Sequence, residues 1–250
     1  MSAVLVIAGS DSSGGAGAQR DLRVLADFGV RAVTALTAVT TQTDHQILSS
    51  LIPPPNLIRD QIKAALCMCP IAAVKIGMLG NAATVEAVVN GLDEMRGIPI
   101  ILDPVLVSSS GASLLDENGQ QTMRTRLFPL VALLTPNMPE AAALLGEPPA
   151  YNEETMLLQA NLLLGLGTKA VLLKGGHGTG NLSVDLLVEE GKKPIRLVAA
   201  RLPTTMRGTG CALSSAIAAQ LAVGKSLAES CQIAKAYLFK KMKISLANAF

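Results

Sequence analysis

The sequence predicts an α/β fold in which a mainly parallel sheet is covered by helices on both faces. Short runs rich in Val and Ile alternate with longer amphipathic stretches along the 250 residues. These runs are apolar at consecutive positions, which is typical of strands buried on both faces. No Ser-rich linker, break in composition or internal repeat divides the chain. We therefore expect residues 1–250 to form one domain.

The N-terminal half is predicted to begin with a buried strand, Ala3–Ala8, that ends in a polar, glycine-rich loop. A helix is expected from Gly15 to Phe28, where Gly29 ends it, and a second strand from Val30 to Thr40. The three prolines at 53–55 open the next helix, since proline is tolerated in a first helical turn. We expect this helix to run through Cys67. The elements expected after it are a strand Ala72–Ile76, a helix Ala82–Met95 and a strand Ile98–Leu102.

The C-terminal half continues the alternation and adds one hairpin. Two strands, Leu182–Glu189 and Ile195–Ala199, flank Glu190–Pro194, which is typical of a hairpin turn. The other elements expected here are strands Val131–Leu134 and Ala170–Lys174 and helices Pro139–Leu145, Glu153–Leu166, Cys211–Val223 and Leu227–Leu246.

Composition excludes several classes of function. The formal net charge is only +2, and two tyrosines, four phenylalanines and no tryptophan leave little for stacking bases, so we expect no nucleic-acid partner. No stretch has the ~20 apolar residues of a membrane span, and the N-terminus lacks the basic region of a signal peptide. Four cysteines, with Cys67-Met68-Cys69 unaccompanied by a second pair at zinc spacing, indicate neither a disulfide framework nor a zinc site. We expect a cytoplasmic protein.

Polar turns follow five of the predicted strands. They carry Asp11, Lys75, Asp103, Asn137 and Lys174, each at a carboxyl end. Ligands of open α/β sheets bind along that edge. Turns are built from Gly, Pro, Asn and Asp in any case, but five charged or amide side chains on one edge indicate a polar site.

The turn Gly208-Thr209-Gly210-Cys211 leads directly into a predicted helix. Its two glycines allow successive N–H groups to point the same way, and the helix dipole would add positive potential, which suits an anion. We expect the pKa of Cys211 to be lowered there, so that the thiol can accept the proton of a substrate hydroxyl. A glycine turn capping an ordinary helix with a buried cysteine fits these residues equally well. Neither a P-loop, a complete G-x-G-x-x-G nor a G-x-S-x-G elbow occurs.

The opening motif resembles that of the hydroxymethylpyrimidine/phosphomethylpyrimidine kinases, a family of the ribokinase-like superfamily in thiamine biosynthesis. That motif is Ala8-Gly9-Ser10-Asp11-Ser12-Ser13-Gly14-Gly15-Ala16-Gly17, followed by Gln19, Asp21 and Leu22. The resemblance extends in family order through the motifs Val74–Leu79, Leu102–Val105, Thr135–Ala141, Lys174–His177 and Gly208–Cys211. It implies a three-layer α/β/α fold with a small hairpin elaboration, ATP as phosphate donor with Mg²⁺, and a homodimer.

The resemblance also implies roles for individual residues. Those expected to hold the aminopyrimidine are Gly9, Asp21, Gln42, Met78 and Val105; those expected near Mg²⁺ and the nucleotide are Asp103, Asn137 and Glu140; and those expected to contact phosphate are Lys174 and Thr209. Cys211 would act as the base. A carboxylate and an amide suit an aminopyrimidine, although Asp21 also fits a first-turn helix charge, Gln42 a polar loop and Met78 the core.

Three departures from the family pattern stand out. Arg207 replaces the usual histidine before Gly208 and adds a fixed positive charge there. The segment Gln42-Thr43-Asp44-His45-Gln46 lacks the usual glycine, and the chain ends without the family's His-Gly-Pro tail. Neutral drift in loops is one explanation of these departures. The alternative is a shifted substrate or weakened catalysis.

The function expected is phosphorylation of 4-amino-5-hydroxymethyl-2-methylpyrimidine, followed by phosphorylation of the monophosphate. A pyridoxal-type kinase of the same superfamily is an alternative, because its substrate also carries a hydroxymethyl group on a nitrogen heterocycle. A catalytically weak pyrimidine-binding protein is another, marked by Arg207 and the altered loop.

Overall fold

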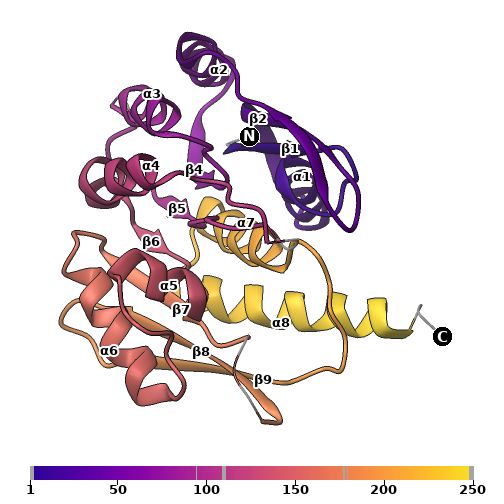
Figure 1. Cartoon of the computed structure of the whole chain (residues 1–250), viewed down its shortest axis with the longest axis vertical. Coiled ribbons are helices and arrows are strands. Elements are labelled where there is room, and N and C mark those ends of the chain that lie inside the picture. Colours follow the sequence, from indigo (N-terminus) through magenta and orange to yellow (C-terminus); the bar gives the residue numbers. More distant parts are fainter. Residues whose placement is uncertain (1–2, 94, 109–110, 177, 179, 248–250) are drawn as a thin grey trace.

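Every strand of the described chain belongs to one sheet (Figure 1). The structure is a computed structural model, and it describes residues 3–93, 95–108, 111–176, 178 and 180–247. The sheet order is β3-β2-β1-β4-β5-β6-β7-β8-β9. The six strands from β2 to β7 in this order are mutually parallel, and β3, β8 and β9 add antiparallel pairs at the two edges.

The strands are β1 (Ala3–Asp11), β2 (Arg31–Gln42), β3 (Ile47–Leu51), β4 (Ile71–Ile76), β5 (Ile100–Leu102), β6 (Leu133–Leu134), β7 (Ala170–Lys174), β8 (Leu182–Glu189) and β9 (Ile195–Ala200). The α-helices are α1 (Gly17–Asp27), α2 (Pro55–Met68), α3 (Ala82–Leu92), α4 (Glu117–Thr122), α5 (Met138–Leu145), α6 (Glu153–Leu164), α7 (Thr209–Ala222) and α8 (Leu227–Ala247). Short π- and 3-10-helical turns, Met123–Leu127 and Phe128–Leu130, continue α4.

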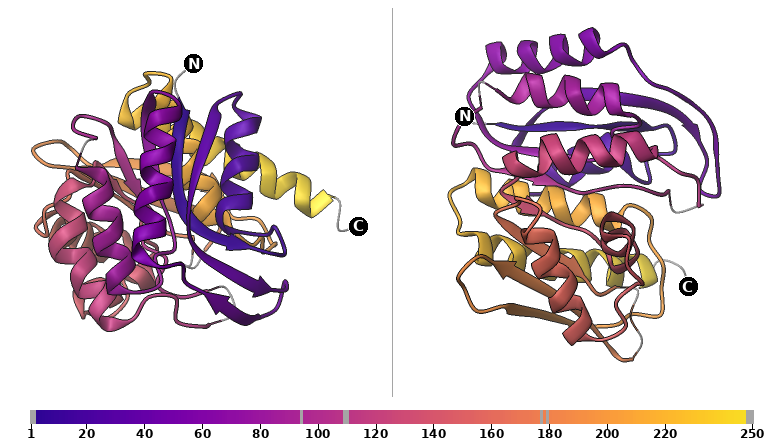
Figure 2. Two further views of the ribbon diagram at one scale, coloured as in Figure 1. Left: turned by 90° about the horizontal axis from the view of Figure 1, so that it is seen from above. Right: turned by 60° about the vertical axis from the view of Figure 1, so that its left-hand side comes forward.

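Alternate residues of each central strand enter one of two hydrophobic cores, because strand side chains point to opposite faces. In β1, Leu5 and Ile7 pack with helices α2, α3, α5 and α6 on one face. Val4 and Val6 pack with α1, α7 and α8 on the other. The left-hand view of Figure 2 shows these helical layers on opposite sides of the sheet. The predicted three-layer α/β/α arrangement is confirmed.

The predicted strands and helices are all present, most with ends shifted by one to three residues. Ala170–Lys174 and Leu182–Glu189 match as predicted, and the hairpin closes as β8 and β9. The predicted helix Ala82–Met95 ends earlier, at Leu92, and Glu94 lies outside the described residues. The helix expected at Gly15 begins at Gly17, because the Asp11 carboxylate accepts the N–H groups of Ser13 and Ala16 and holds the intervening turn.

Two elements had no counterpart in the prediction. β3 is an edge strand whose residues are mostly exposed, so its sequence lacks a buried run. Helix α4 is polar throughout, and the Asp116 side chain starts it by accepting the N–H of Gly119.

Among the described residues, none of the helices combines the length and apolar composition that crossing a bilayer requires.

Candidate active site

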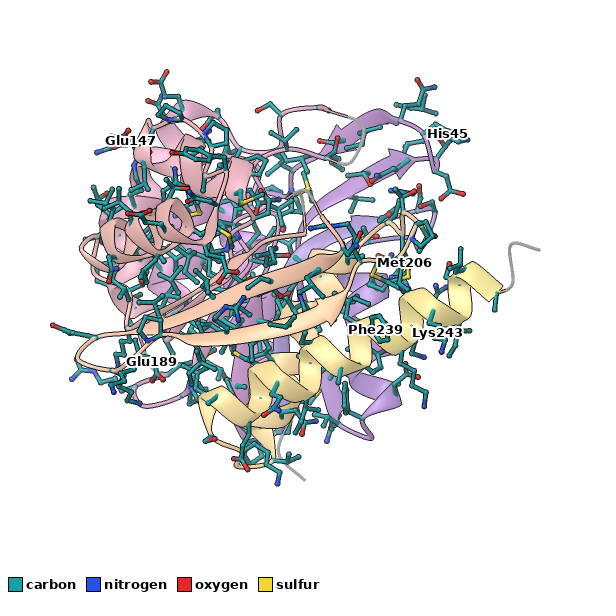
Figure 3. All side chains as sticks on the ribbon, turned by 90° about the horizontal axis from the view of Figure 1, so that it is seen from below. His45, Glu147, Glu189, Met206, Phe239 and Lys243 are labelled. Atoms are coloured by element: carbon teal, nitrogen blue, oxygen red, sulfur yellow. The ribbon has the colours of Figure 1, made fainter. Side chains whose placement is uncertain are left out.

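A cleft of about 960 Å³ opens along the carboxyl edge of the parallel strands. It meets the turns after β1, β5, β6 and β7, the end of β2, and the first turn of α7. In Figure 3, His45 marks the tip of the β2–β3 pair, Met206 the connection from β9 to α7, and Phe239 helix α8. The predicted site residues that line this cleft are Gly9, Gln42, Met78, Asp103, Val105, Asn137, Glu140, Lys174, Gly208, Thr209, Gly210 and Cys211.

Lys174 and two carboxylates form the charged centre of the cleft. The Lys174 Nζ lies 2.9 Å from Oδ1 of Asp103 and 3.9 Å from Oε2 of Glu140. Burial works against the charged form of Lys174, but the two carboxylates outweigh it and raise the pKa of the ammonium. Lys174 is therefore a permanent cation with its charge directed at the cleft.

Glu140 sits at the start of α5 in a capping box with Asn137. The Asn137 side chain accepts the backbone N–H of Glu140 at 2.8 Å, and Oε2 of Glu140 accepts that of Asn137 at 2.7 Å. Burial raises the pKa of Glu140 to about 7, with Asp103 adding to the rise and Lys174 opposing it. Any cation that enters the cleft will favour the ionised form.

The first turn of α7 is open to the cleft because it begins with glycines. Gly208 has a φ of +69°, and a Cβ there would stand 2.4 Å from the carbonyl oxygen of Gly15. A Cβ on Gly210 would lie 3.0 Å from Oδ2 of Asp103 and 3.1 Å from Nζ of Lys174. The start of the helix thus lies close to Lys174 and Asp103 without an intervening side chain. The unpaired backbone N–H groups of a helix start suit an anion.

The expectation that the Cys211 thiol is acidified is wrong. Burial raises the pKa of Cys211 to about 11; Asp21 and Asp103 add to the rise, while Lys75 and the Gly17 N–H oppose it. The partial charge of a helix terminus is small beside the cost of burying a thiolate. Cys211 therefore lines the cleft as a neutral thiol in the ligand-free protein.

The structure does not place Asp21 against the cleft. Its side chain is fully buried; Oδ2 accepts from Nζ of Lys75 at 2.8 Å, and Oδ1 accepts from the Ser215 hydroxyl at 2.8 Å. Lys75, in contrast, lies on the cleft floor, where Asp21, Cys211 and Asp103 raise its pKa in spite of its burial. The carboxylate expected to hold a substrate amino group instead holds this lysine.

The remaining predicted substrate contacts lie on one wall. The Met78 sulfur lies against Gly9, where a Cβ would be 3.0 Å from it, and the Met78 carbonyl accepts from the hydroxyl of Thr37. The Gln42 backbone is tied to Ser12, and its Oε1 accepts from the Thr40 hydroxyl at 3.2 Å. Val105 follows Asp103 in a tight turn. Together they make an apolar wall with one amide.

Two groups of cleft residues had not been assigned to the site. Lys235, Leu238, Phe239 and Met242 line it from α8, at the spacing of one helix face; that spacing is the signal that would have found them. Arg207 joins the glycine-rich loop to Asp44 through hydrogen bonds that no local pattern predicts. His177, part of the Lys174 motif, lies outside the described residues.

The described residues hold no group of three or more His, Cys, Asp or Glu side chains able to enclose a metal ion. Asp103 and Glu140 are nonetheless neighbours across Lys174. No hydrogen bond within the described chain occupies Oδ2 of Asp103 or Oε1 of Glu140. Carboxylate oxygens of this kind suit Mg²⁺, which takes few protein ligands and keeps waters or phosphate oxygens for the rest.

Comparison with known proteins finds relatives that match this chain over most of its length. The hydroxymethylpyrimidine/phosphomethylpyrimidine kinase of Aquifex aeolicus is 38% identical over 242 residues, which cover 96% of this chain and 94% of that protein. The thiamine biosynthesis bifunctional protein ThiED of Geobacter sulfurreducens is 40% identical over 243 residues, 97% of this chain. The chain spans about half of that bifunctional relative, 49% of its length.

Among solved structures, the pyridoxal kinase of Staphylococcus aureus in complex with AMP-PCP and pyridoxal superposes with a TM-score of 0.88 at 29% identity. The match covers 97% of this chain and 88% of that one. The fold is therefore the ribokinase-like fold of vitamin kinases, as expected. The model of the phosphomethylpyrimidine kinase family matches residues 11–248. With its charged cleft, its glycine turn and these relatives, the chain belongs to the phosphomethylpyrimidine kinase family.

Proposed function

We propose that the protein transfers the γ-phosphate of ATP to the hydroxymethyl group of 4-amino-5-hydroxymethyl-2-methylpyrimidine and then to the resulting monophosphate. The observation that carries the proposal is the meeting of Lys174, Asp103 and the open first turn of α7 in one cleft. Phosphoryl transfer needs mainly positioning and charge neutralisation from the protein. We propose that this kinase domain spans residues 1–250.

Lys174 and Thr209 are the groups proposed to hold the moving phosphoryl group. The Lys174 ammonium supplies a fixed positive charge, and Thr209, which carries a backbone N–H and a hydroxyl, lines the same cleft at the first position of α7. Cys211, two residues further on, is proposed to accept the proton of the substrate hydroxyl. Its thiol must first ionise, and the positive charge of Lys75 favours that step.

Asp103 and Glu140 are proposed to hold Mg²⁺ through their unoccupied oxygens, with Asn137 fixing the orientation of Glu140. When bound, Mg²⁺ would offset negative charge on the phosphates. Glu140→Gln should raise the Mg²⁺ concentration needed for half-maximal rate, because the variant cannot supply an anionic ligand. An unchanged Mg²⁺ requirement would remove Glu140 from the metal site.

The acceptor is proposed to lie on the wall formed by Gly9, Gln42, Met78 and Val105. This wall offers an apolar surface for a ring and one amide for its edge, and an amide both donates and accepts hydrogen bonds. Asp21 is proposed to act indirectly, by keeping Lys75 charged and in place on the cleft floor.

A pyridoxal kinase is the second candidate, and it rests on the superposition with the Staphylococcus aureus enzyme. The 38% identity to the Aquifex kinase, against 29% to the pyridoxal kinase, favours the pyrimidine.

Product analysis by mass spectrometry tests the proposal. Purified protein with Mg-ATP should convert the hydroxymethylpyrimidine first to its monophosphate and then to its diphosphate. Lys174→Met should abolish conversion, whereas Tyr151→Ala, at a side chain 81% exposed, serves as the matched control. Saturable binding of the pyrimidine without any product would favour a binding protein instead.

We propose a cytoplasmic location and a homodimer. All four cysteines are free thiols, and Cys211 must stay reduced to act as a base. The edge strand β3 and its neighbour β2 expose Val39, Leu48 and Leu51, the last at 68%, and an apolar sheet edge of this kind favours pairing. Light scattering should report a dimer for the natural chain and a monomer for Leu51→Lys; a monomer for both would contradict the homodimer.

A further inference from the structure

Arg207 ties three segments of the cleft together. Its Nη1 donates to the Ser13 hydroxyl and to Oδ1 of Asp44, each at 2.9 Å, and its Nη2 donates to Oδ2 of Asp11 at 3.1 Å. Two of the departures from the family pattern, Arg207 and the Asp44 segment, therefore meet in one ion pair.

The two carboxylates that hold Arg207 differ in their surroundings. Asp11 is buried, with its side chain 4% exposed, and it also accepts the backbone N–H groups of the glycine-rich loop. Asp44 is 74% exposed. Its only hydrogen bond within the described chain is the one from Arg207. Asp11 thus holds the guanidinium in a buried ion pair. Water competes with the guanidinium for the exposed Asp44 carboxylate.

The Arg207 guanidinium also has N–H groups that make no hydrogen bond within the described chain. Its three hydrogen bonds use three of the five N–H groups that arginine carries. The others have no acceptor among the described residues. Arg207 lines the cleft, and a Cβ on Gly15 would lie 2.9 Å from its Nη1. The guanidinium therefore lies beside Gly15, whose carbonyl oxygen packs against Gly208 in the turn proposed to hold phosphate.

We propose that Arg207 is a specificity-determining residue for the phosphorylated acceptor, and that Asp44 occupies the place that the acceptor's phosphate takes. This inference rests on the proposed function, because it assigns Arg207 to the substrate of the second transfer. A phosphomonoester carries more charge than a carboxylate and matches the planar fork of arginine. The exposed pair with Asp44 contributes little by itself, so the phosphate displaces it at small cost.

Binding calorimetry without ATP tests the inference independently of turnover. The ligands are the hydroxymethylpyrimidine and its monophosphate, and the proteins are the natural chain, Asp44→Asn, Arg207→Gln and Arg207→Lys. Asp44→Asn removes a competing anion and should tighten the monophosphate several-fold, with the Kd of the alcohol nearly unchanged. Arg207→Gln should weaken the monophosphate by about tenfold or more, the usual effect of losing a charged hydrogen-bond partner. Arg207→Lys should recover part of that affinity.

Equal changes in the Kd of both ligands would show that the Arg207–Asp44 pair only shapes the loop, and would overturn the inference. So would monophosphate binding that neither substitution alters. Because Asp44 is exposed, Asp44→Asn should fold normally and keeps the test decisive if Arg207→Gln does not. Failure of the natural chain to phosphorylate either compound would contradict the proposed function. The changes in Kd of the monophosphate relative to the alcohol would still decide whether Arg207 and Asp44 act as we propose.

Discussion

Cys211 is placed where its neutral form is favoured, although its proposed task is to take up a proton. The thiol is 9% exposed and faces Asp21 and Asp103, and burial is the main cause of its raised pKa. Lys75 is the neighbour that opposes this shift. The thiolate would therefore form with the help of cationic groups during turnover, and it would be scarce at neutral pH.

The pH dependence of kcat/KM should reveal this thiol. Because Cys211 works only when deprotonated and its pKa is about 11, the rate should rise steadily as the pH increases from 7 towards 10. Cys211→Ser should be slower and lose that rise, since a hydroxyl does not titrate in this range. A plateau of the natural chain below pH 8 would contradict the assignment.

The same raised pKa affects stability with a definite sign. The folded state favours the protonated thiol, so the stability that Cys211 contributes is fully present below its ordinary pKa of 9.0 and is lost as the pH rises through about 11. Rates at high pH should therefore be paired with circular dichroism, so that unfolding is not mistaken for titration.

The roles of single residues were predictable only where the sequence neighbourhood decides them. The glycine turn at Gly208–Cys211 and the Asn137–Glu140 cap follow from glycine and capping patterns. The charge state of Cys211 does not, because it depends on burial and on Asp21 and Lys75, which lie far away in the chain. The position of Asp21 behind the cleft depends likewise on long-range pairing.

At the scale of elements, one buried ion pair joins strand β4 to the helices α1 and α7 that cover one face of the sheet beside the cleft. Asp21 lies in α1, Lys75 in β4 and Ser215 in α7, and their contacts fix the two helices that follow the glycine-rich loop and the Gly208–Cys211 turn. Both charged side chains are fully buried.

Lys75→Met should lower the free energy of unfolding by about 3–5 kcal/mol, because it leaves the Asp21 carboxylate buried without its partner. Urea denaturation gives this value. Arg196→Met is the matched control: it breaks a close pair with Glu153, but that pair is exposed, and we expect little change. Equal effects of the two substitutions would show that burial of the first pair has no energetic consequence.

Gly210→Ala should separate activity from stability. The new Cβ would press on Asp103 and Lys174, so kcat/KM should fall by about tenfold or more, while the helix should gain slightly because alanine is a better helix former. Gly224→Ala is the opposite control: its φ is +84° and the space around it is open, so it should cost about 1–2 kcal/mol of stability without loss of activity. Full activity in Gly210→Ala would mean that the close approach is not needed.

Elements with a buried apolar face were predictable, and those without one were not. The central strands carry runs of Val, Ile and Leu that are buried on both faces, and every one of them was found. β3 and α4 are exposed or polar, so they leave no periodic signal. Their formation depends on pairing with β2 and on the Asp116 cap.

At the scale of the whole molecule, the sheet topology explains why the site lies where it does. The chain passes from β1 through α1 to β2 on one side and then through α2 to β4 on the other side, with α1 and α2 on opposite faces of the sheet. At such a reversal of strand order a crevice forms at the carboxyl ends of the strands. The polar turns after the parallel strands meet there, which the sequence pattern predicts. Helix α8, from the far end of the chain, completes the cleft, which the pattern does not predict.

The most direct test of the proposed activity is the ratio of kcat/KM for the hydroxymethylpyrimidine to kcat/KM for pyridoxal, measured with Mg-ATP in one assay. We predict a ratio well above one, because the family match and the closer identity both favour the pyrimidine. A ratio below one, or no phosphorylated product from the pyrimidine at all, would contradict the proposal that this cleft serves a pyrimidine kinase.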